Sequence, residues 1–243
     1  MGDVNTRADA KSKTRAILSL ILFGIAFGFV EAAVVVYLRD LAQPIRVRAG
    51  LPSADLFSLL RADQMGASLR LMRIEVVREG ATLVMLAAAA WAAMGNLPRP
   101  KAHTWLAGFS LAFGVWDLAF YGWLRVMIGW PASPYTWDLL FLLPVPWAGP
   151  VLAPVIIALS LAVGGALALA REPLRIPRFA WALLLGGAAV VLIAFMWDWR
   201  LWVAGGMPRA FPWDIFGIGE CLGVAGFCLA LMRFRRTFQK NIE

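Results

Sequence analysis

Acidic side chains stand inside or at the ends of long apolar stretches of this sequence. They are Glu31, Glu75, Glu79, Asp117, Asp138, Asp198, Asp214 and Glu220. An ionised carboxylate at membrane depth needs a partner charge or water, so such residues normally face the interior of a helix bundle or a pathway through it. When the apolar stretches are taken as membrane spans, all of these carboxylates fall toward the same side of the membrane. We therefore predict that they converge on one cavity, open to that side.

The spacing of these residues indicates which side chains share a helix face. Glu75 and Glu79 are four residues apart and would lie on one face, with Arg78 beside them as their counter-ion. Asp117 and Tyr121 repeat the four-residue spacing on a later segment. The predicted substrate- or ion-binding residues are therefore Glu31, Glu75, Arg78, Glu79, Asp117, Tyr121, Asp138 and Glu220.

The tryptophans are distributed unevenly between the two sides of the membrane. Most of the 12 tryptophans lie toward the side that carries the carboxylates. An interfacial aromatic belt would populate both sides. We expect some of these indole rings to line the predicted cavity, and the alternative is a thicker belt on that side.

The composition explains why these residues must be positioned by membrane helices. Of the 243 residues, 61% are hydrophobic and 16% are charged, against about 45–50% and about 25% in a soluble domain. This composition predicts an integral membrane protein and excludes a soluble enzyme domain or a disulfide-stapled secreted scaffold. The net charge of +8 would suggest nucleic acid as a partner of a soluble chain. Here the basic residues fall between apolar segments, so we expect the lipid bilayer, not nucleic acid, as the partner.

Six apolar runs are long enough to cross a hydrocarbon core, which takes about 20 helical residues. We predict an all-α, polytopic bundle of six transmembrane helices, forming one domain over residues 16–232 between basic tails at 1–15 and 233–243. In the last run, Gly219 and Gly223 form a pair of small residues that lets a neighbouring helix approach closely. The predicted spans are residues 16–38, 71–94, 105–130, 151–170, 179–197 and 215–232.

The loops predict how the bundle is oriented. Short cytoplasmic loops retain Lys and Arg, and one set of loops and tails carries far more of these residues than the other. We therefore predict a bacterial-type cytoplasmic membrane, with both termini in the cytoplasm and the carboxylates toward the outside. The residues behind this prediction are Arg7, Lys11, Lys13, Arg15, Arg99, Lys101, Arg171, Arg175, Arg178, Arg233, Arg235, Arg236 and Lys240.

The segment before the fourth span does not fit a continuous helix. Residues 137–170 would form a helix of about 51 Å, well beyond the hydrocarbon core. Prolines at 144, 146, 150 and 154 each remove a backbone donor and disturb the preceding turn. We predict a short outer helix over residues 136–143 and an unwound segment over 144–149, either re-entrant or lying at the interface. Asp138 would then stand in the first turn of a helix, where a carboxylate is favoured.

Several kinds of site are excluded. The only histidine, His103, lies in a short loop away from the buried carboxylates, which excludes His-based catalytic triads, His-rich zinc sites and bis-His haem ligation. Cys221 and Cys228 fit neither a metal-ligand spacing nor a disulfide framework. No catalytic residue, metal or cofactor is assigned from the sequence.

Three functions remain. The first is binding or transport of a cation, coupled to protons, with a hard cation such as Mg²⁺ or Ca²⁺ suited to oxygen ligands; a transporter with so few helices would form a homo-oligomer. The second is an enzyme acting on a lipid or polyprenyl-linked substrate at the periplasmic leaflet. The third is a structural or assembly subunit, whose carboxylates only pair with arginines. We favour the first because the carboxylates outnumber the nearby arginines, which are Arg39, Arg78, Arg125 and Arg200.

Overall fold

Six long helices dominate the computed structural model, which describes residues 2–48, 68–95, 97, 102–171, 176–204 and 209–239. Each of them contains a stretch long and apolar enough to cross a membrane, so the predicted all-α polytopic bundle is confirmed. The long helices are α1 (Gly2–Arg48), α2 (Ser68–Gly95), α3 (Ala102–Ile128), α4 (Leu152–Ala170), α5 (Arg178–Phe195) and α7 (Trp213–Gln239). The short elements are β1 (Trp137–Phe141), β2 (Trp147–Pro150) and the helix α6 (Trp199–Val203).

The helices begin and end close to the predicted boundaries, except in α1 and at the end of α7, which continues to Gln239 beyond the predicted end at residue 232. Helix α1 continues well beyond the predicted span of residues 16–38 in both directions and contains Pro44. The flanks of this apolar run hold Ala, Lys and Arg, which favour helix. The polar residues therefore limit the apolar span, while the helix itself continues through them. Part of the predicted charge pattern, namely Arg99, Lys101, Arg175 and Lys240, lies outside the described residues, as does the segment 49–67.

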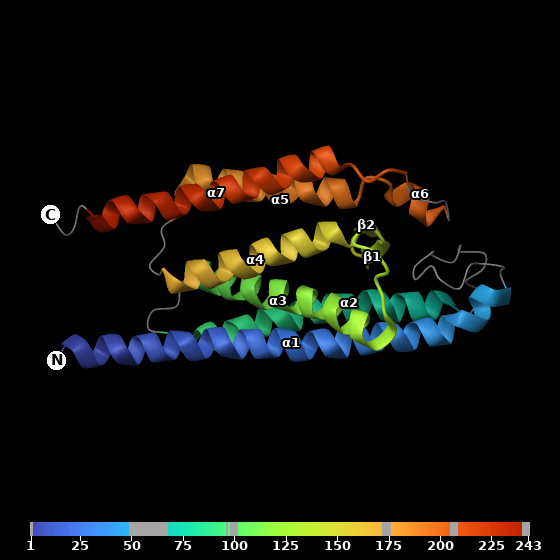
Figure 1. Cartoon of the computed structure of the whole chain (residues 1–243), viewed down its shortest axis with the longest axis horizontal. Coiled ribbons are helices and arrows are strands. Elements are labelled where there is room, and N and C mark those ends of the chain that lie inside the picture. The colour runs from blue at the N-terminus through green and yellow to red at the C-terminus, as the bar shows by residue number, and fades with distance from the viewer. Residues whose placement is uncertain are drawn as a thin grey trace.

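The two ends of the bundle differ in what they carry. Both chain termini lie at one end, which we call the terminal end, while β1, β2 and α6 lie at the other, the hairpin end (Figure 1). Helices α1, α2, α3 and α4 pack into one group. Helices α5 and α7 pack mainly on each other and reach the first group through α4 and β2. The bundle therefore consists of a four-helix unit and a two-helix unit.

Within both units, helices approach so closely that a side chain would not fit at the crossing. A Cβ atom on Gly114 of α3 would lie 2.3 Å from the carbonyl oxygen of Ala158 on α4. A Cβ atom on Gly187 of α5 would lie 2.6 Å from the carbonyl oxygen of Gly219 and 2.7 Å from the backbone nitrogen of Gly223. The predicted packing role is confirmed for Gly219, where a Cβ would lie 2.8 Å from the backbone nitrogen of Val191, whereas a Cβ on Gly223 would meet nothing within 4 Å. Such close contacts hold helices together in lipid, where apolar side chains gain nothing by leaving the solvent.

The segment between α3 and α4 is a β-hairpin, so the short outer helix predicted for residues 136–143 is wrong. Strands β1 and β2 pair antiparallel, with Trp137 opposite Pro150 and Leu139 opposite Ala148. The second strand satisfies backbone groups that a helix would have satisfied internally. Asp138 consequently lies in a strand and not in the first turn of a helix.

The prolines act as predicted, although their structural setting differs. The chain leaves helical geometry over residues 144–149, as expected, but residues 147–149 belong to β2. Pro144 and Pro146 lie between the strands, where the missing backbone donor disrupts no ladder hydrogen bond. Pro154 lies in the first turn of α4, a position that tolerates proline because the first helical N–H groups have no partner within the helix.

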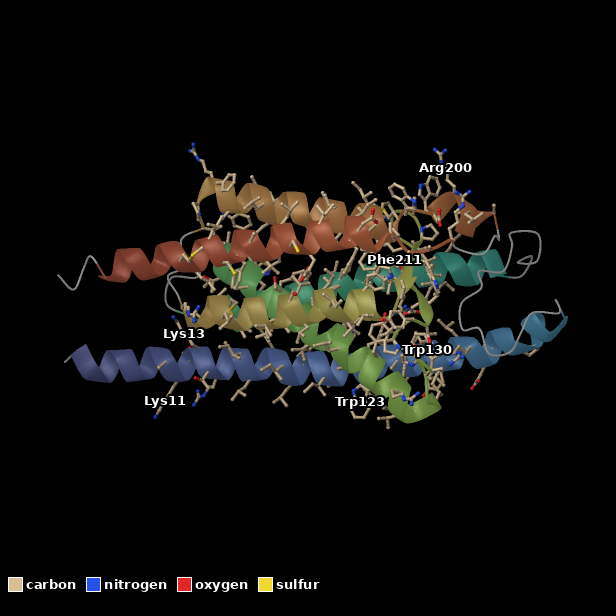
Figure 2. All side chains as sticks on the ribbon, turned by 45° about the horizontal axis from the view of Figure 1, so that its top comes forward. Lys11, Lys13, Trp123, Trp130, Arg200 and Phe211 are labelled. Carbon is tan, nitrogen blue, oxygen red and sulfur yellow. The ribbon has the colours of Figure 1, made fainter. Side chains whose placement is uncertain are left out.

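Aromatic side chains concentrate at the hairpin end. Phe195, Phe211 and Phe216 are buried against one another beneath the hairpin. In Figure 2, Trp130 and Phe211 lie at this end and Lys11 at the other. The hairpin is therefore seated on an aromatic base formed by Phe195 of α5, Phe216 of α7 and Phe211 of the segment just before α7.

Candidate functional site

A cavity of about 1090 Å³ runs between the four-helix unit and the two-helix unit. Its walls are mainly apolar, and α3 lines it from His103 to Tyr121, a length of about 27 Å at 1.5 Å per residue. The structure places all of the predicted binding residues on this one cavity, in the half nearer the hairpin end. They are Glu31, Glu75, Arg78, Glu79, Asp117, Tyr121, Asp138 and Glu220.

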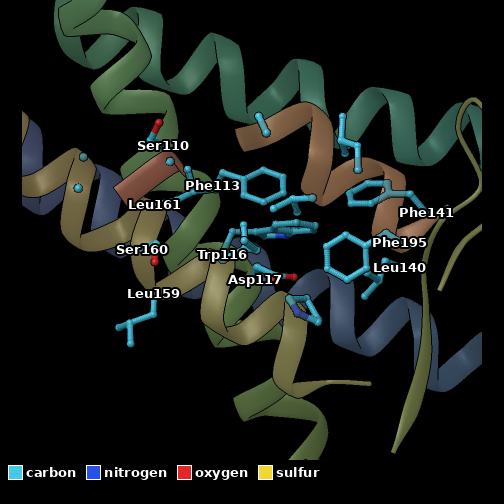
Figure 3. A pocket seen from close by; sticks show the side chains of 18 of the residues that line it. Ser110, Phe113, Trp116, Asp117, Leu140, Phe141, Leu159, Ser160, Leu161 and Phe195 are labelled. Atoms are coloured by element: carbon cyan, nitrogen blue, oxygen red, sulfur yellow. The ribbon is translucent and has the colours of Figure 1, made fainter. Parts of the chain in front are cut away.

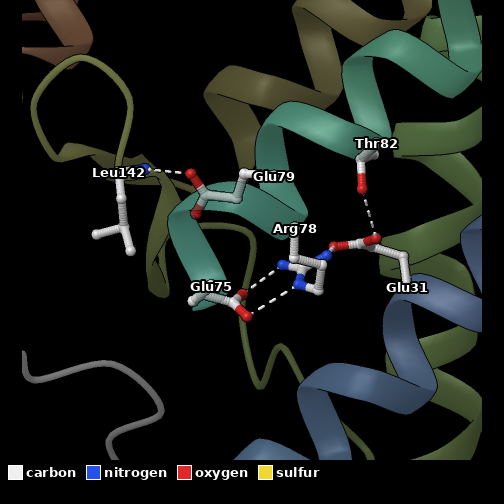
Figure 4. A network of polar contacts seen from close by, with 6 residues as sticks. All are labelled: Glu31, Glu75, Arg78, Glu79, Thr82 and Leu142. Carbon is white, nitrogen blue, oxygen red and sulfur yellow. Dashed lines mark hydrogen bonds and ion pairs between the residues drawn. The ribbon is translucent and has the colours of Figure 1, made fainter. Parts of the chain in front are cut away.

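Arg78 holds two of these carboxylates. Its guanidinium forms a bidentate pair with Glu75 on the same helix, with 2.9 Å between Nε and Oε2. It also pairs with Glu31 of α1, which accepts a further hydrogen bond from the hydroxyl of Thr82 at 3.3 Å. Figure 4 shows the guanidinium between the two carboxylates. This arrangement leaves one net negative charge and ties α1 to α2.

Glu79 has a different role from the one its spacing predicts. Arg78 pairs with Glu75 and Glu31 and does not bond to Glu79. The Glu79 carboxylate accepts a hydrogen bond of 2.8 Å from the backbone N–H of Leu142, just after β1 (Figure 4). Glu79 is 7% exposed. It therefore anchors the hairpin to α2 instead of joining the ion-pair network.

Asp138 and Tyr121 form a second polar pair. The Tyr121 hydroxyl donates to Oδ2 of Asp138 at 2.8 Å, and the backbone N–H of Leu139 donates to Oδ1 at 2.9 Å. Asp138 is only 3% exposed, and this burial raises its pKa to about 7 against the lowering effects of both hydrogen bonds and of the Arg39 charge. The carboxyl group therefore exchanges its proton near neutral pH.

Asp117 lies close to this pair but has no partner. Among the residues that the structure describes, no hydrogen bond or ion pair reaches its carboxyl group, while Asp138 acts on it as a repelling charge. Its side chain points toward the rings of Trp116 and Phe195 (Figure 3). An unpaired carboxylate in an aromatic pocket is the group that a bound cation would satisfy.

Two buried indoles in the same region also lack partners. The Nε1 donors of Trp116 and Trp147 are buried without an acceptor within the described part of the chain. Both residues line the cavity, and Phe141 contacts each of them, with ring centroids 6.4 Å and 5.5 Å away. The excess of Trp on this side of the membrane predicted indoles in the cavity wall, but it did not single out these two.

Glu220 joins the two units of the bundle. Its carboxylate on α7 accepts a hydrogen bond from the hydroxyl of Ser160 on α4. Ser160 was not among the predicted site residues, because one hydroxyl in a long apolar helix gives no sequence signal. The pair is a polar contact across the cavity that the two units share.

Other predicted polar groups lie apart from the cavity. Arg125 continues the spacing of Asp117 and Tyr121, but it is exposed and donates to the backbone carbonyls of Gly129 and Pro131, the latter at 2.9 Å. Two further carboxylates of the apolar segments line no part of this cavity: Asp198 accepts from the backbone N–H of Arg209 at 3.1 Å, and Asp214 lies in the first turn of α7.

The arrangement suits charge pairing and proton exchange. In the described ranges, no three His, Cys, Asp or Glu side chains come together as a metal site.

No protein-family model, curated protein or solved structure matches the chain. Its function is therefore inferred from the chemistry of the cavity itself.

Proposed function

We propose that this membrane protein binds a cation at Asp117 and carries it across the bilayer in exchange for a proton. The observation that supports this proposal is the unpartnered Asp117 carboxyl group inside an aromatic cavity. A carboxylate in such a place is expensive unless a cation or a proton occupies it. A cation bound at Asp117 and a proton bound at the neighbouring Asp138 can then replace one another.

The charges around the site favour a cation over an anion. Arg78, which lines the cavity, is already shared by Glu31 and Glu75. Glu79 is bonded to a backbone N–H, and Asp138 lies near Asp117. An anionic ligand would meet net negative charge, whereas a cation would neutralise Asp117 and relieve its repulsion with Asp138.

Asp138 supplies the proton in this proposal. Its pKa of about 7 means that both forms of the carboxyl group are populated near neutral pH. The titratable and charged groups that act on it are Tyr121 and Asp117 from α3 and Arg39 from α1, beside the backbone N–H of Leu139. A cation arriving at Asp117 favours the ionised form of Asp138, so binding releases a proton, and proton uptake at Asp138 favours release of the cation.

We further propose a bacterial-type cytoplasmic membrane, with the terminal end in the cytoplasm and the hairpin end outside. The distribution of Lys and Arg supports this orientation, and both termini lie at one end of the bundle (Figure 1). The cavity residues that carry charge would then be reached from the outer side.

The two alternative functions have less support. The reading as a structural subunit explains Glu31, Arg78 and Glu75, whose charges are spent on each other, but it leaves Asp117 without a purpose. An enzyme acting on a lipid-linked substrate would use the same apolar cavity, where the hydroxyl of Ser160 stands beside the Glu220 carboxylate. That pair does not involve Asp117, so this alternative also leaves Asp117 without a role.

The first test measures thermal unfolding of the purified protein with tetramethylammonium, Na⁺, Mg²⁺ or Ca²⁺ across a range of pH. A ligand of the folded state raises the unfolding temperature. We expect one cation to stabilise the protein more strongly as pH rises through about 7, the pKa of Asp138. Asp117→Asn should abolish the effect, and the control Asp214→Asn, at an exposed position away from the cavity, should keep it.

Transport is then measured in proteoliposomes with a pH-sensitive dye. An inward gradient of the stabilising cation should drive protons out in wild type and in Asp214→Asn, but not in Asp117→Asn. Equal stabilisation of all three proteins, or cation flux without proton movement, would overturn the proposal.

A further inference from the structure

The cavity is far larger than an inorganic ion needs. Its charged residues lie in the half nearer the hairpin, and the remainder of the wall is mainly apolar side chains of α3, α4, α5 and α7, with His103, Thr104 and Ser110 as its polar members on α3. Along α3 this wall covers about 27 Å, nearly the thickness of the hydrocarbon core. A small ion at Asp117 would leave most of this space unfilled.

The cavity also opens sideways. Leu159 and Val163 on α4 and Val224 on α7 line it and are 54%, 49% and 46% exposed. Exposed apolar side chains at the rim of a cavity between membrane helices face lipid. The site therefore has a route of entry from within the bilayer, which suits a molecule that already has a chain in the membrane.

The polar end requires two kinds of group in one ligand. Asp117 requires a cation, and the aromatic faces of Trp116 and Phe113 beside it suit a diffuse ammonium charge. The buried Nε1 donors of Trp116 and Trp147 require an acceptor oxygen. A bare metal ion supplies no such acceptor, whereas an ammonium group linked to an ester or hydroxyl oxygen supplies both.

We propose that the cavity binds a cationic amphiphile, with its ammonium group at Asp117, an oxygen of its head at the Trp116 indole on the neighbouring residue, and its apolar tail along α3 and α4 toward His103. This inference rests on the proposed function and specifies the class of cation. It also explains why a carboxylate and a long apolar groove occur in the same space.

A chain that leaves lipid for an apolar groove gains little free energy, so the strength of binding does not report where the tail lies. The experiment therefore locates the tail directly. The probe is palmitoylcholine with a diazirine at the tail end, added to the full-length protein in nanodiscs and activated by light. Mass spectrometry then locates the adducts. We expect them on cavity residues near the terminal end, such as Trp181 and Leu231, and not on Trp91, which is 71% exposed and lines no part of the cavity.

A head-group control separates charge from apolar binding. The neutral isostere 3,3-dimethylbutyl palmitate with the same diazirine lacks only the positive charge. We expect at least tenfold weaker labelling of the cavity by this ester, and the same loss for palmitoylcholine in Asp117→Asn. Competition by unlabelled palmitoylcholine should remove the cavity adducts of wild type.

A second variant blocks the groove without touching the charged end. Gly164 lines the cavity, and a Cβ there would meet only the ring of Phe227, at 4.0 Å, and no backbone atom. Its neighbour Gly165 packs against Ala107 and Leu111 of α3. At 1.5 Å per residue along α3, Gly164 therefore lies about 10 Å from Asp117 toward the terminal end. Gly164→Phe should remove tail adducts beyond this level. The control Gly122→Phe, at a glycine with open space outside the cavity, should not.

The outcomes separate this inference from the proposed function. If tetramethylammonium still stabilises the protein through Asp117 but the tail adducts fall on Trp91 and other outer positions, the amphiphile inference is wrong and cation exchange stands. If neither tetramethylammonium nor palmitoylcholine depends on Asp117, both are wrong. Tail adducts in the cavity that disappear in Asp117→Asn and in Gly164→Phe support both.

Discussion

The hydroxyl of Tyr121 donates a hydrogen bond to the Asp138 carboxylate at 2.8 Å, joining the middle of the candidate site to the first strand of the hairpin. The two residues come from α3 and β1, on either side of the turn that links them. Because Asp138 is buried, the protonation of this single carboxyl group affects both the stability of the hairpin and the charge of the cavity.

The stability of the protein should depend on Asp138 between about pH 4 and pH 7. Burial raises the folded-state pKa from 3.8 to about 7, so the folded protein binds the proton more tightly than the unfolded chain. Asp138 therefore contributes at most about 4 kcal/mol to the free energy of unfolding. This contribution is fully present below about pH 4 and is lost as the pH rises to about 7. In Asp138→Asn, the decline of the unfolding temperature over this range should be shallower. Tyr121→Phe removes a bond that lowers this pKa, so the decline should extend to higher pH; unchanged slopes in both variants would contradict the assignment.

Removing the guanidinium of Arg78 should destabilise the bundle strongly. Arg78→Gln leaves Glu31 and Glu75 close together without their shared cation; breaking a fully buried pair from one side costs about 3–5 kcal/mol, and this partly buried network should lose somewhat less. Arg73→Gln, at an exposed position on the same helix, should have little effect. The measurement is thermal unfolding in detergent. Combining Arg78→Gln with Glu31→Gln should recover part of the loss, and failure to recover any would argue against the pair.

The hydrogen bond from Leu142 to Glu79 should govern the opening of the hairpin. Glu79→Ala removes the acceptor and leaves the partly buried N–H of Leu142 without a protein partner, at a cost of about 1 kcal/mol or somewhat more. Glu79→Gln keeps an acceptor oxygen and should behave almost as wild type. Hydrogen exchange at residues 137–150 reports this directly: we expect faster exchange in Glu79→Ala alone, with α5 and α7 unaffected.

Two glycines of α3 should respond oppositely to the same substitution. Gly114→Ala places a Cβ 2.3 Å from the carbonyl oxygen of Ala158, so α3 and α4 must separate, and we expect a loss of at least about 2 kcal/mol. Gly122→Ala meets nothing within 4 Å and should be neutral or slightly stabilising, since alanine favours helix. Thermal unfolding of the two variants side by side tests the close contact, and equal effects would refute it.

The sequence predicts the helices well because each span depends on local polarity alone. It also predicts that the carboxylates gather toward one end, since position along a span follows from the order of the helices. The hairpin could not be predicted in this way. Residues 137–141 form a short apolar run, which suits a helix or a strand equally, and only the pairing of Leu139 with Ala148 decides between them.

The partners within the site were equally inaccessible from the sequence. Spacing along one helix correctly joins Arg78 to Glu75, but Glu31 lies 47 residues away on another helix, and the true partner of Glu79 is a backbone N–H beyond α3. Both are tertiary contacts. Likewise, nothing in the spacing of the carboxylates identifies Asp117 as the unpartnered one, because that depends on which groups other elements bring near it, and among the described residues Asp138 is near but repels it.

The contact between Gly187 and Gly219 locks α5 and α7 together, and the four-helix unit is locked in the same manner by Gly114. The cavity therefore has two walls that are each stiff but are joined to one another lightly, through β2 and along α4. Rigid-body rotation of one wall would change the width of the cavity without repacking either helix interface. With β2 as the pivot at the hairpin end, the widest excursion would occur at the opposite end, beside His103.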